Sequence, residues 1–257
     1  MTGLFLTRAR LRRDPDVVTL QRVLLPDDGD RRREASHHLI WSLFAGDADA
    51  TRDFLFRETT RPGGRPTFLI LSARAPCADA RLFEIETKPF APELEPGDRL
   101  AFELHANPTV QAEHPKTGVK GRYDVMTMAV LRLPQQASKL EKARAIEGAA
   151  RRWLGRQGLA AGFRIVERYD PDRDAGDDAP PGFERAPCDV DEEPLALAAT
   201  GFQSAAVPGK RVVGRLGLID FAGVLTVTDP DLFVAALTKG FGRAKAYGCG
   251  LMLIRRI

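Results

Sequence analysis

Alternating apolar and polar positions divide the first part of the chain into strand-like and helix-like segments. The strand-like segments are LFLTRARL (4–11), DFLFRET (53–59), PTFLILSAR (66–74) and FEIETK (83–88). A helix is predicted from an N-cap at Asp30 to Gly46, and a short, weakly helical segment from Ala78 to about Phe83. Because RPGG separates the second and third strands, we expect them to form a hairpin, and the order is β-α-β-β-α-β.

The second part of the chain approximates the same order. Its strand-like segments are RLAFELHAN (99–107), GFRIVERY (162–169), LALAATGFQSAAV (195–207), RVVGRLGLIDFAGVLTVTD (211–229) and CGLMLIRRI (249–257). Ser138 and Glu141 form a capping-box pattern before a helix whose apolar positions are Ile146, Ala149, Ala150, Trp153 and Leu154. Asp229 and Pro230 begin another helix, with an apolar face at Phe233, Ala236 and Leu237, and Gly240 ends it.

A stretch rich in proline, KPFAPELEPGD (88–98), separates the two parts and is typical of a linker. The sequence therefore predicts an α+β protein of two tandem ferredoxin-like (RRM-like) βαββαβ domains, residues 1–95 and 96–257.

Charge is distributed unevenly over these domains. The whole chain has a formal charge of +3, but residues 166–194 hold eleven acids against three arginines. That segment carries −8 and is expected to be a solvated loop, so the other residues carry +11. A body this basic is typical of a nucleic-acid-binding protein.

Composition excludes several classes of protein. No apolar run approaches the roughly 20 residues of a membrane span, and the N-terminus lacks the order of a secretory signal. The three cysteines, Cys77, Cys188 and Cys249, are scattered, which favours neither a disulfide framework nor a zinc ribbon. We expect a cytoplasmic protein with no metal site and no cofactor.

A glycine-rich stretch, GFGRAKAYGCG (240–250), lies between the last helix and the last strand. A dinucleotide-binding loop follows a strand and opens a helix, so the order here is reversed. A Walker A loop ends in Gly-Lys-Ser/Thr, whereas Lys245 is followed by Ala246. Two interpretations remain: a loop that approaches polynucleotide phosphates, or a flexible turn into an edge strand.

The stretch GFGRAKAYGCGLMLI closely resembles the glycine-rich loop of the CRISPR-associated repeat-cleaving endoribonucleases, in particular the CasE subunits of type I-E Cascade. HHLIWSLF, RDFLFR, FELHANP and FAGVLTV add to the resemblance, which spans the whole chain apart from the acidic segment. It implies a metal-independent endoribonuclease that cleaves CRISPR repeat hairpins in pre-crRNA by attack of the 2′-OH. The products would carry 2′,3′-cyclic phosphate and 5′-OH ends.

Partners follow from the same resemblance. They are the CRISPR repeat RNA hairpin, in pre-crRNA and crRNA, and the other Cascade subunits. No membrane partner is expected, and the free protein is expected to be a monomer.

His37 is the candidate catalytic residue. The family histidine lies on the first helix, four residues before a Trp, and His37 matches this position with Trp41 in register. A helical wheel places His37 at the edge of an apolar stripe and turns His38 towards solvent. Histidine suits proton transfer because its ordinary pKa of about 6.5 leaves both forms populated near neutrality.

Some family members carry a tyrosine one turn before the histidine, where this chain has Glu34. A carboxylate at this spacing could orient His37 or raise its pKa, but it supplies no phenol. Lys245 is the second candidate catalytic residue, as a cation that stabilises the phosphorane. Arg31, Arg32 and Arg33 are candidate phosphate ligands or, alternatively, solvated charges.

Further RNA contacts are expected from two basic segments and the glycine-rich loop. By the resemblance, a basic hairpin with Lys210, Arg211 and Arg215 enters the RNA groove at the stem base. Candidates for phosphate contacts, or alternatively a mobile charged loop, are Lys116, Lys120 and Arg122. In the glycine-rich loop the candidates are Lys239, Gly240, Gly242, Arg243, Gly248 and Gly250.

Two rival functions remain. One is a non-cleaving subunit that binds structured RNA within a ribonucleoprotein complex, because Glu34 replaces the tyrosine. The other is a general RRM-type protein, which is disfavoured because no strand carries the aromatic motif used for base stacking.

Overall fold

The computed structural model describes residues 3–44, 51–59, 64–77, 81–166, 197–206 and 215–257. It is an α+β structure with antiparallel sheets, and it forms two compact units. Unit 1 consists of Met1–Pro92, Ser204–Leu216 and Gly242–Leu251, and unit 2 of Glu93–Gln203, Gly217–Phe241 and Met252–Ile257. Both units are thus composed of separate chain segments, and the boundary at residues 95 and 96 stays a prediction.

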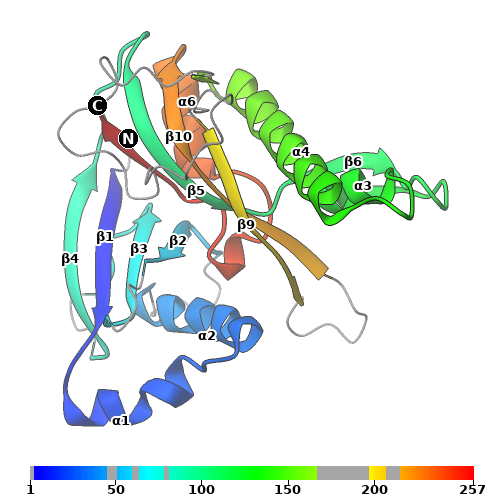
Figure 1. Ribbon diagram of the computed structural model, residues 1–257. Helices are drawn as coiled ribbons and strands as arrows, with labels where there is room; N and C mark the ends of the chain where they lie inside the picture. The colour runs from blue at the N-terminus through cyan, green and yellow to red at the C-terminus, as the bar shows by residue number, and fades with distance from the viewer. Residues whose placement is uncertain (1–2, 45–50, 60–63, 78–80, 167–196, 207–214) are drawn as a thin grey trace, which may run out of the picture. The chain divides into compact units, whose positions relative to one another are not determined.

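The sheet of unit 1 contains four strands in the order β2-β3-β1-β4, with every neighbouring pair antiparallel (Figure 1). The strands are β1 (Leu4–Leu11), β2 (Phe54–Glu58), β3 (Thr67–Ser72) and β4 (Phe83–Phe90). The expected hairpin of β2 and β3 is confirmed, with Phe54 opposite Ser72 and Glu58 opposite Phe68.

One face of this sheet is apolar because alternate residues point to it. Ala9 and Leu11 of β1 and Phe68 and Ile70 of β3 are buried there. Helix α2 (Gly29–Trp41) and the 3-10 turn η1 (Ser42–Phe44) cover that face. Full burial of a leucine, isoleucine or phenylalanine side chain contributes about 1.5–3 kcal/mol. The shared core therefore holds α2 against the sheet.

The start of α2 differs from the expectation. Asp28, rather than Asp30, is the N-cap, because its carboxylate accepts a hydrogen bond from Arg31 N at 2.9 Å. Three acids precede the apolar stripe in this stretch, so the sequence pattern alone did not distinguish them. The α-helix also ends at Trp41 and not at Gly46, and η1 continues the turn to Phe44.

A helix that the pattern did not reveal, α1 (Pro15–Leu24), precedes α2. It buries only Val17 fully and leaves Val18, Leu20 and Val23 exposed, so few of its apolar residues join the core although they recur at helical spacing. The predicted helical segment at residues 78–83 is wrong at its end, because Arg81 and Leu82 form a turn and Phe83 begins β4. Residues 78–80 lie outside the described residues.

Unit 2 contains a sheet in the order β11-β5-β10-β8, and β9 also pairs with β10. The strands are β5 (Arg99–Ala106), β8 (Phe163–Ile165), β9 (Leu197–Ala206), β10 (Arg215–Val227) and β11 (Met252–Arg256). Each strand segment expected here contains a strand of this sheet, although most of the strands are shorter than expected. Strands β9 and β10 lie within the expected segments 195–207 and 211–229, and β10 ends two residues early, at Val227. The last expected strand begins three residues late, at Met252.

Two long helices of unit 2 follow their capping signals. Helix α4 (Lys139–Ala160) has both hydrogen bonds of the Ser138–Glu141 capping box. Helix α6 (Pro230–Lys239) begins at Asp229, whose carboxylate accepts from Leu232 N, and ends at Gly240. The glycine-rich stretch follows, with a short 3-10 turn, η2 (Lys245–Tyr247).

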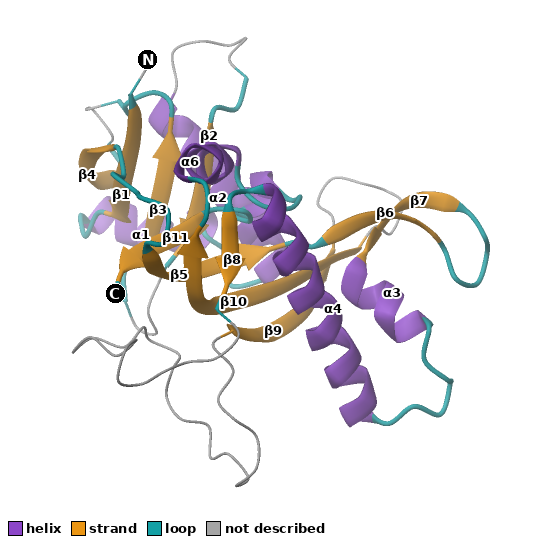
Figure 2. Ribbon diagram, turned by 90° about the horizontal axis from the view of Figure 1, so that it is seen from above, coloured by secondary structure: helices purple, strands orange, loops and turns teal. Residues whose placement is uncertain are grey.

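A hairpin and a helix between β5 and α4 were not expected. Strands β6 (Thr109–Glu113) and β7 (Lys120–Asp124) pair antiparallel, and α3 (Val125–Leu131) follows them (Figure 2). The sequence was interpreted there as a charged loop, because these strands are largely exposed and lack a repeating apolar face.

Candidate functional site

Helix α2 presents His37 at the edge of the buried face in unit 1. His37 is half-buried, whereas His38 is exposed. The ring of His37 lies beside two aromatic rings, with its centroid 6.2 Å from Trp41 and 6.4 Å from Phe54. Since Trp41 also meets Phe54 edge to face, the imidazole is surrounded by rings on its buried side.

One hydrogen bond fixes the tautomer of His37. The indole Nε1–H of Trp41 donates to His37 Nε2 at 3.1 Å. An indole nitrogen only donates, so Nε2 must be the acceptor and the neutral ring carries its proton on Nδ1. Nδ1 is buried and has no hydrogen-bond partner among the described residues.

Glu34 does not take the role that its spacing suggested. It is exposed, and neither ring nitrogen of His37 bonds to it. Burial lowers the pKa of His37, and the charges of His38 and Arg52 lower it further. The expectation that Glu34 raises this pKa is therefore wrong. The ring is neutral at pH 7 and can accept a proton once Nε2 is released.

Acidic side chains hold two of the three arginines at the start of α2. Arg32 makes a forked hydrogen bond to Glu58 of β2, with Nε 3.1 and 3.0 Å from the two carboxylate oxygens. Arg33 Nη1 lies 2.8 Å from Asp30 Oδ1. Within the described part of the chain Arg31 is exposed and has no ion-pair partner, so it is the arginine of this group that is most available to a phosphate.

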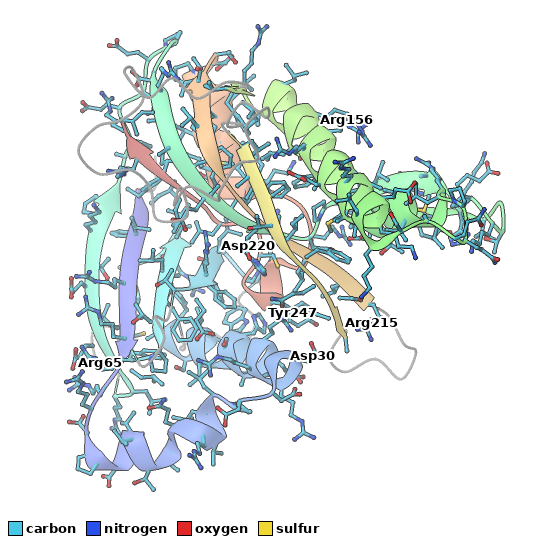
Figure 3. The ribbon with its side chains drawn as sticks, viewed as in Figure 1. Asp30, Arg65, Arg156, Arg215, Asp220 and Tyr247 are labelled. Carbon is cyan, nitrogen blue, oxygen red and sulfur yellow. The ribbon has the colours of Figure 1, made fainter. Side chains whose placement is uncertain are left out.

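Asp30 also ties the end of β9 to α2. Its second oxygen, Oδ2, accepts from Ala206 N at 3.2 Å (Asp30 is labelled in Figure 3). Arg215, at the start of β10, donates from Nε to Ser204 Oγ at 2.6 Å and from Nη2 to Ser204 O at 2.6 Å. The described ends of the predicted basic hairpin are thus bonded to each other and to the helix of His37. Lys210 and Arg211 lie outside the described residues.

The glycine-rich loop of unit 1 has a backbone that few side chains tolerate. Gly242, Gly248 and Gly250 have φ of 73°, 80° and 91°. Ala244 adopts φ 55°, which makes it the non-glycine residue with positive φ in the described part of the chain. A left-handed alanine is strained, and such strain persists where surrounding contacts fix it.

This loop packs directly on the elements that hold His37. The turn η2 lies against α2 and β2. A side chain at Gly248 would come within 3.4 Å of the Phe56 ring, and Phe56 neighbours Phe54, which touches His37. Lys245 and Tyr247 of η2 are both half-buried, and Figure 3 shows Tyr247 on the side of the loop near α2.

The predicted site residues therefore fall into two groups. Unit 1 contains His37, Lys245, the arginines of α2, Gly242, Arg243, Gly248, Gly250 and Arg215, and its glycine-rich loop contacts α2. Unit 2 holds Lys239 and Gly240 at the end of α6, and also Lys116, Lys120 and Arg122. Lys120 and Arg122 are exposed on strand β7, not in a loop, and Lys116 is exposed between β6 and β7.

Two features of the site were missed from the sequence. Trp41 was used only as a motif position, although a histidine and a tryptophan at i and i+4 lie on one helix face and can bond. Tyr247 was passed over because it has no helical or strand pattern around it. Its signal was the loop itself, since the glycines on either side bring it back to α2.

No three His, Cys, Asp or Glu side chains within the described ranges lie close enough together to hold a metal ion. No helix there is both long and apolar enough to cross a membrane.

The chain is similar in sequence to known proteins. The model of the CRISPR associated protein family matches residues 4–256. The chain is 26% identical over 236 residues to CRISPR system Cascade subunit CasE of Escherichia coli K12, covering 91% of this chain and 96% of that protein. It is 29% identical over 167 residues to CRISPR-associated endoribonuclease Cse3 of Thermus thermophilus, covering 65% and 60%.

Solved structures show the same fold. The chain matches Thermus thermophilus Cse3, bound to an RNA that represents a pre-cleavage complex, with a TM-score of 0.62 and 21% identity over 98% of this chain and 99% of that one. It matches Cas6e of Escherichia coli K-12 with a TM-score of 0.55 and 19% identity over 98% and 100%. Because the family model spans nearly the whole chain, this protein belongs to the family of CRISPR associated proteins.

Proposed function

We propose that this protein is a metal-independent endoribonuclease that cleaves CRISPR repeat hairpins in pre-crRNA and keeps the crRNA as a Cascade subunit. The 2′-OH attacks the neighbouring phosphate and leaves 2′,3′-cyclic phosphate and 5′-OH ends. Support comes from two relatives, one named as a Cascade subunit and the other as a CRISPR-associated endoribonuclease.

The observation that carries the proposal is the place of His37. It is half-buried on α2, its pKa is lowered, and the glycine-rich loop packs against the same helix within unit 1. A neutral imidazole, with the lysine and the backbone N–H groups of a loop that packs on the same helix, supplies the parts that acid–base cleavage of a phosphodiester requires.

His37 acts as the general base through Nε2. That atom accepts from Trp41 in the free protein, so the substrate 2′-OH must replace the indole N–H before its proton can move to His37. The buried Nδ1–H gains no partner among the described residues to stabilise the imidazolium, which keeps the ring a weak base that releases its proton easily.

Tyr247 is the proton donor for the 5′-oxygen that leaves. Its phenol O–H can donate, it belongs to the loop that packs on α2, and it supplies the group that Glu34 lacks. Lys245, in the same turn, places positive charge near the phosphorane. The positive φ at Ala244 and Gly248 fixes both ends of this turn.

The stem of the RNA hairpin meets the basic segment between β9 and β10. Lys210 and Arg211 contact its phosphates or groove edge, and Arg215 joins the two strands at the base of the segment. The tie from Asp30 to Ala206 supports this assignment because it links the segment to the catalytic helix. Arg31 and Arg243, which are exposed, and the glycines of the loop add further contacts.

Both halves of the chain are ferredoxin-like domains, divided near residues 95 and 96. The strand orders β2-β3-β1-β4 and β11-β5-β10-β8 support this because each places in its centre the strands that come first and third along the chain among those four. We also propose that the protein is cytoplasmic, that it is a monomer when it is not bound in Cascade, and that it needs no cofactor.

A second candidate function is RNA binding without cleavage. One observation favours it: Nε2 of His37 is occupied by Trp41 and Nδ1 is buried, so neither nitrogen is free in this structure. If RNA does not displace Trp41, the protein binds the repeat and leaves it intact.

Incubation with a labelled repeat RNA in EDTA separates the two functions. We expect one cut at the base of the hairpin, with a cyclic phosphate on the upstream product and a 5′-OH on the downstream one. RNA that stays intact but bound supports the second candidate. Activity that disappears with chelator and returns with Mg²⁺ contradicts the proposed chemistry.

A further inference from the structure

Unit 2 contains a recess that none of the proposed RNA contacts uses. It lies between β6, α3 and α4 and has a volume of about 340 Å³. Figure 2 shows α3 and α4 next to each other beside the β6–β7 hairpin. Small side chains leave the space open, mainly those of Ala112, Ala129, Ala145 and Ala149. Val125 and Met128 of α3 complete an apolar floor.

Three arginines border this apolar floor: Arg132, Arg152 and Arg156 (Arg156 is labelled in Figure 3). All three are exposed, and none makes an ion pair with another residue of the described chain. No acidic side chain of the described residues lines the recess. Three like charges around one small recess repel one another, so an anionic partner is favoured there.

The floor decides which kind of anion fits. None of the lining side chains is aromatic, so nucleobases would find no ring on which to stack. Phosphates would meet the arginines but leave the apolar floor uncovered. A protein segment satisfies both parts, because it can place an aliphatic side chain in the recess and carboxylates against the arginines. Arginine and methionine are also enriched in protein interfaces.

We propose that this recess is a docking site for an acidic segment of another Cascade subunit. One apolar side chain of that segment enters the recess, and flanking Asp or Glu side chains pair with Arg132, Arg152 and Arg156. This inference rests on the proposed role of the chain as a Cascade subunit.

The test uses the full chain co-expressed with the other Cascade subunits of its host and a repeat-flanked RNA. Retention of the chain in the complex is measured by size-exclusion chromatography over a range of salt. One variant, Arg152→Glu with Arg156→Glu, reverses the charge, and a second, Ala145→Trp, fills the recess. The matched control, Lys139→Glu with Arg144→Glu, makes the same charge change at exposed positions of α4 that do not line the recess.

We expect both recess variants to dissociate at least about tenfold more readily than the control, because removing a paired interfacial charge weakens binding strongly. Cleavage and affinity for the isolated repeat hairpin should match the control. If Ala145→Trp fails to fold by thermal melt, the charge variant alone decides.

If both variants stay in the complex as well as the control does, the recess is not a docking site. A loss of hairpin affinity beyond that of the control also overturns the docking site and makes the recess an RNA site. A wild-type chain that cleaves repeat RNA but never joins the complex refutes the docking and leaves the endoribonuclease intact. A wild-type chain that does neither refutes the proposed function as well.

Discussion

The imidazole of His37 lies in surroundings that favour its neutral form. Aromatic rings remove water from its buried side, and His38 and Arg52 place positive charge nearby. Both effects disfavour the protonated ring, so its pKa falls below the ordinary value of about 6.5. A general base must be unprotonated to act, and His37 meets that condition at neutral pH.

The pH dependence of cleavage should show this shift. As the pH falls through the pKa of His37 the base becomes protonated, so kcat/KM should fall with a midpoint below about 6.5. Because His38 lowers the pKa of His37, His38→Ala should move the midpoint upward. Single-turnover rates from pH 4.5 to 8, with the protein in excess of the RNA but below saturation, give both midpoints. A wild-type midpoint above 6.5 would contradict the assignment of this limb to His37.

Tyr247→Phe removes the proposed proton donor and keeps the ring. Cleavage should slow by about 10²- to 10⁴-fold while repeat affinity stays nearly constant. The matched control is Tyr123→Phe, which removes a hydroxyl that donates to Val119 O in unit 2 and should cut normally. Rates are measured in single turnover with the wild type alongside.

A substrate with a bridging 5′-sulfur distinguishes an acid from a merely structural residue. A thiolate leaves without protonation, so Tyr247→Phe should cleave this RNA nearly as fast as the wild type. His37→Ala should remain slow on it, because the 2′-OH still needs a base. If the sulfur substrate does not rescue Tyr247→Phe, Tyr247 is not the proton donor.

At the scale of elements, the site is held by α2, β2 and the glycine-rich loop. Strand β2 was predictable from its apolar run, and helix α2 from Leu39 and Ile40 at its end together with the apolar residues that follow. The loop was predictable as a glycine-rich connection between α6 and β11, but its contact with α2 joins residues about 200 positions apart. No local pattern encodes such a contact, and for the same reason Tyr247 was missed.

Capping residues located the start of some helices from the sequence, but not the start of α2. Ser138 and Asp229 each begin the helix that the sequence assigns to them, because one polar side chain stands before a clear apolar stripe. Before α2, Asp28 and Asp30 both fit, and tertiary contacts decide between them. Asp28 caps the helix, while Asp30 is used to bond Ala206 and Arg33.

We propose that the segment between β9 and β10 contacts the stem of the RNA hairpin. Lys210→Ala with Arg211→Ala should weaken hairpin binding. It should also reduce the slope of log affinity against log salt by up to about two, because a phosphate that is no longer contacted keeps about one bound counterion. Filter binding at four salt concentrations measures both. Arg22→Ala with Lys88→Ala, at exposed positions of unit 1, should change neither by much. An unchanged slope in the first variant would mean that other residues contact the stem.

At the scale of the whole molecule, the proposed general base and the proposed RNA-binding surface belong to different parts of the chain. His37 lies on α2, whereas the arginines and lysines that we propose to bind RNA are spread over both units. One largely neutral imidazole adds little to a sum of phosphate contacts. An enzyme built this way can lose its chemistry and still hold its RNA, which suits a protein that retains its product.

Comparison of His37→Ala with His38→Ala tests the central claim most directly. Single-turnover cleavage of labelled repeat RNA in EDTA and the affinity for the same RNA are measured for both, after thermal melts show equal stability. We expect His37→Ala to lose at least about 10²-fold in rate with nearly unchanged affinity, and His38→Ala to cut at close to the wild-type rate. If His37→Ala cuts as fast as the wild type, the active site is not built on this residue.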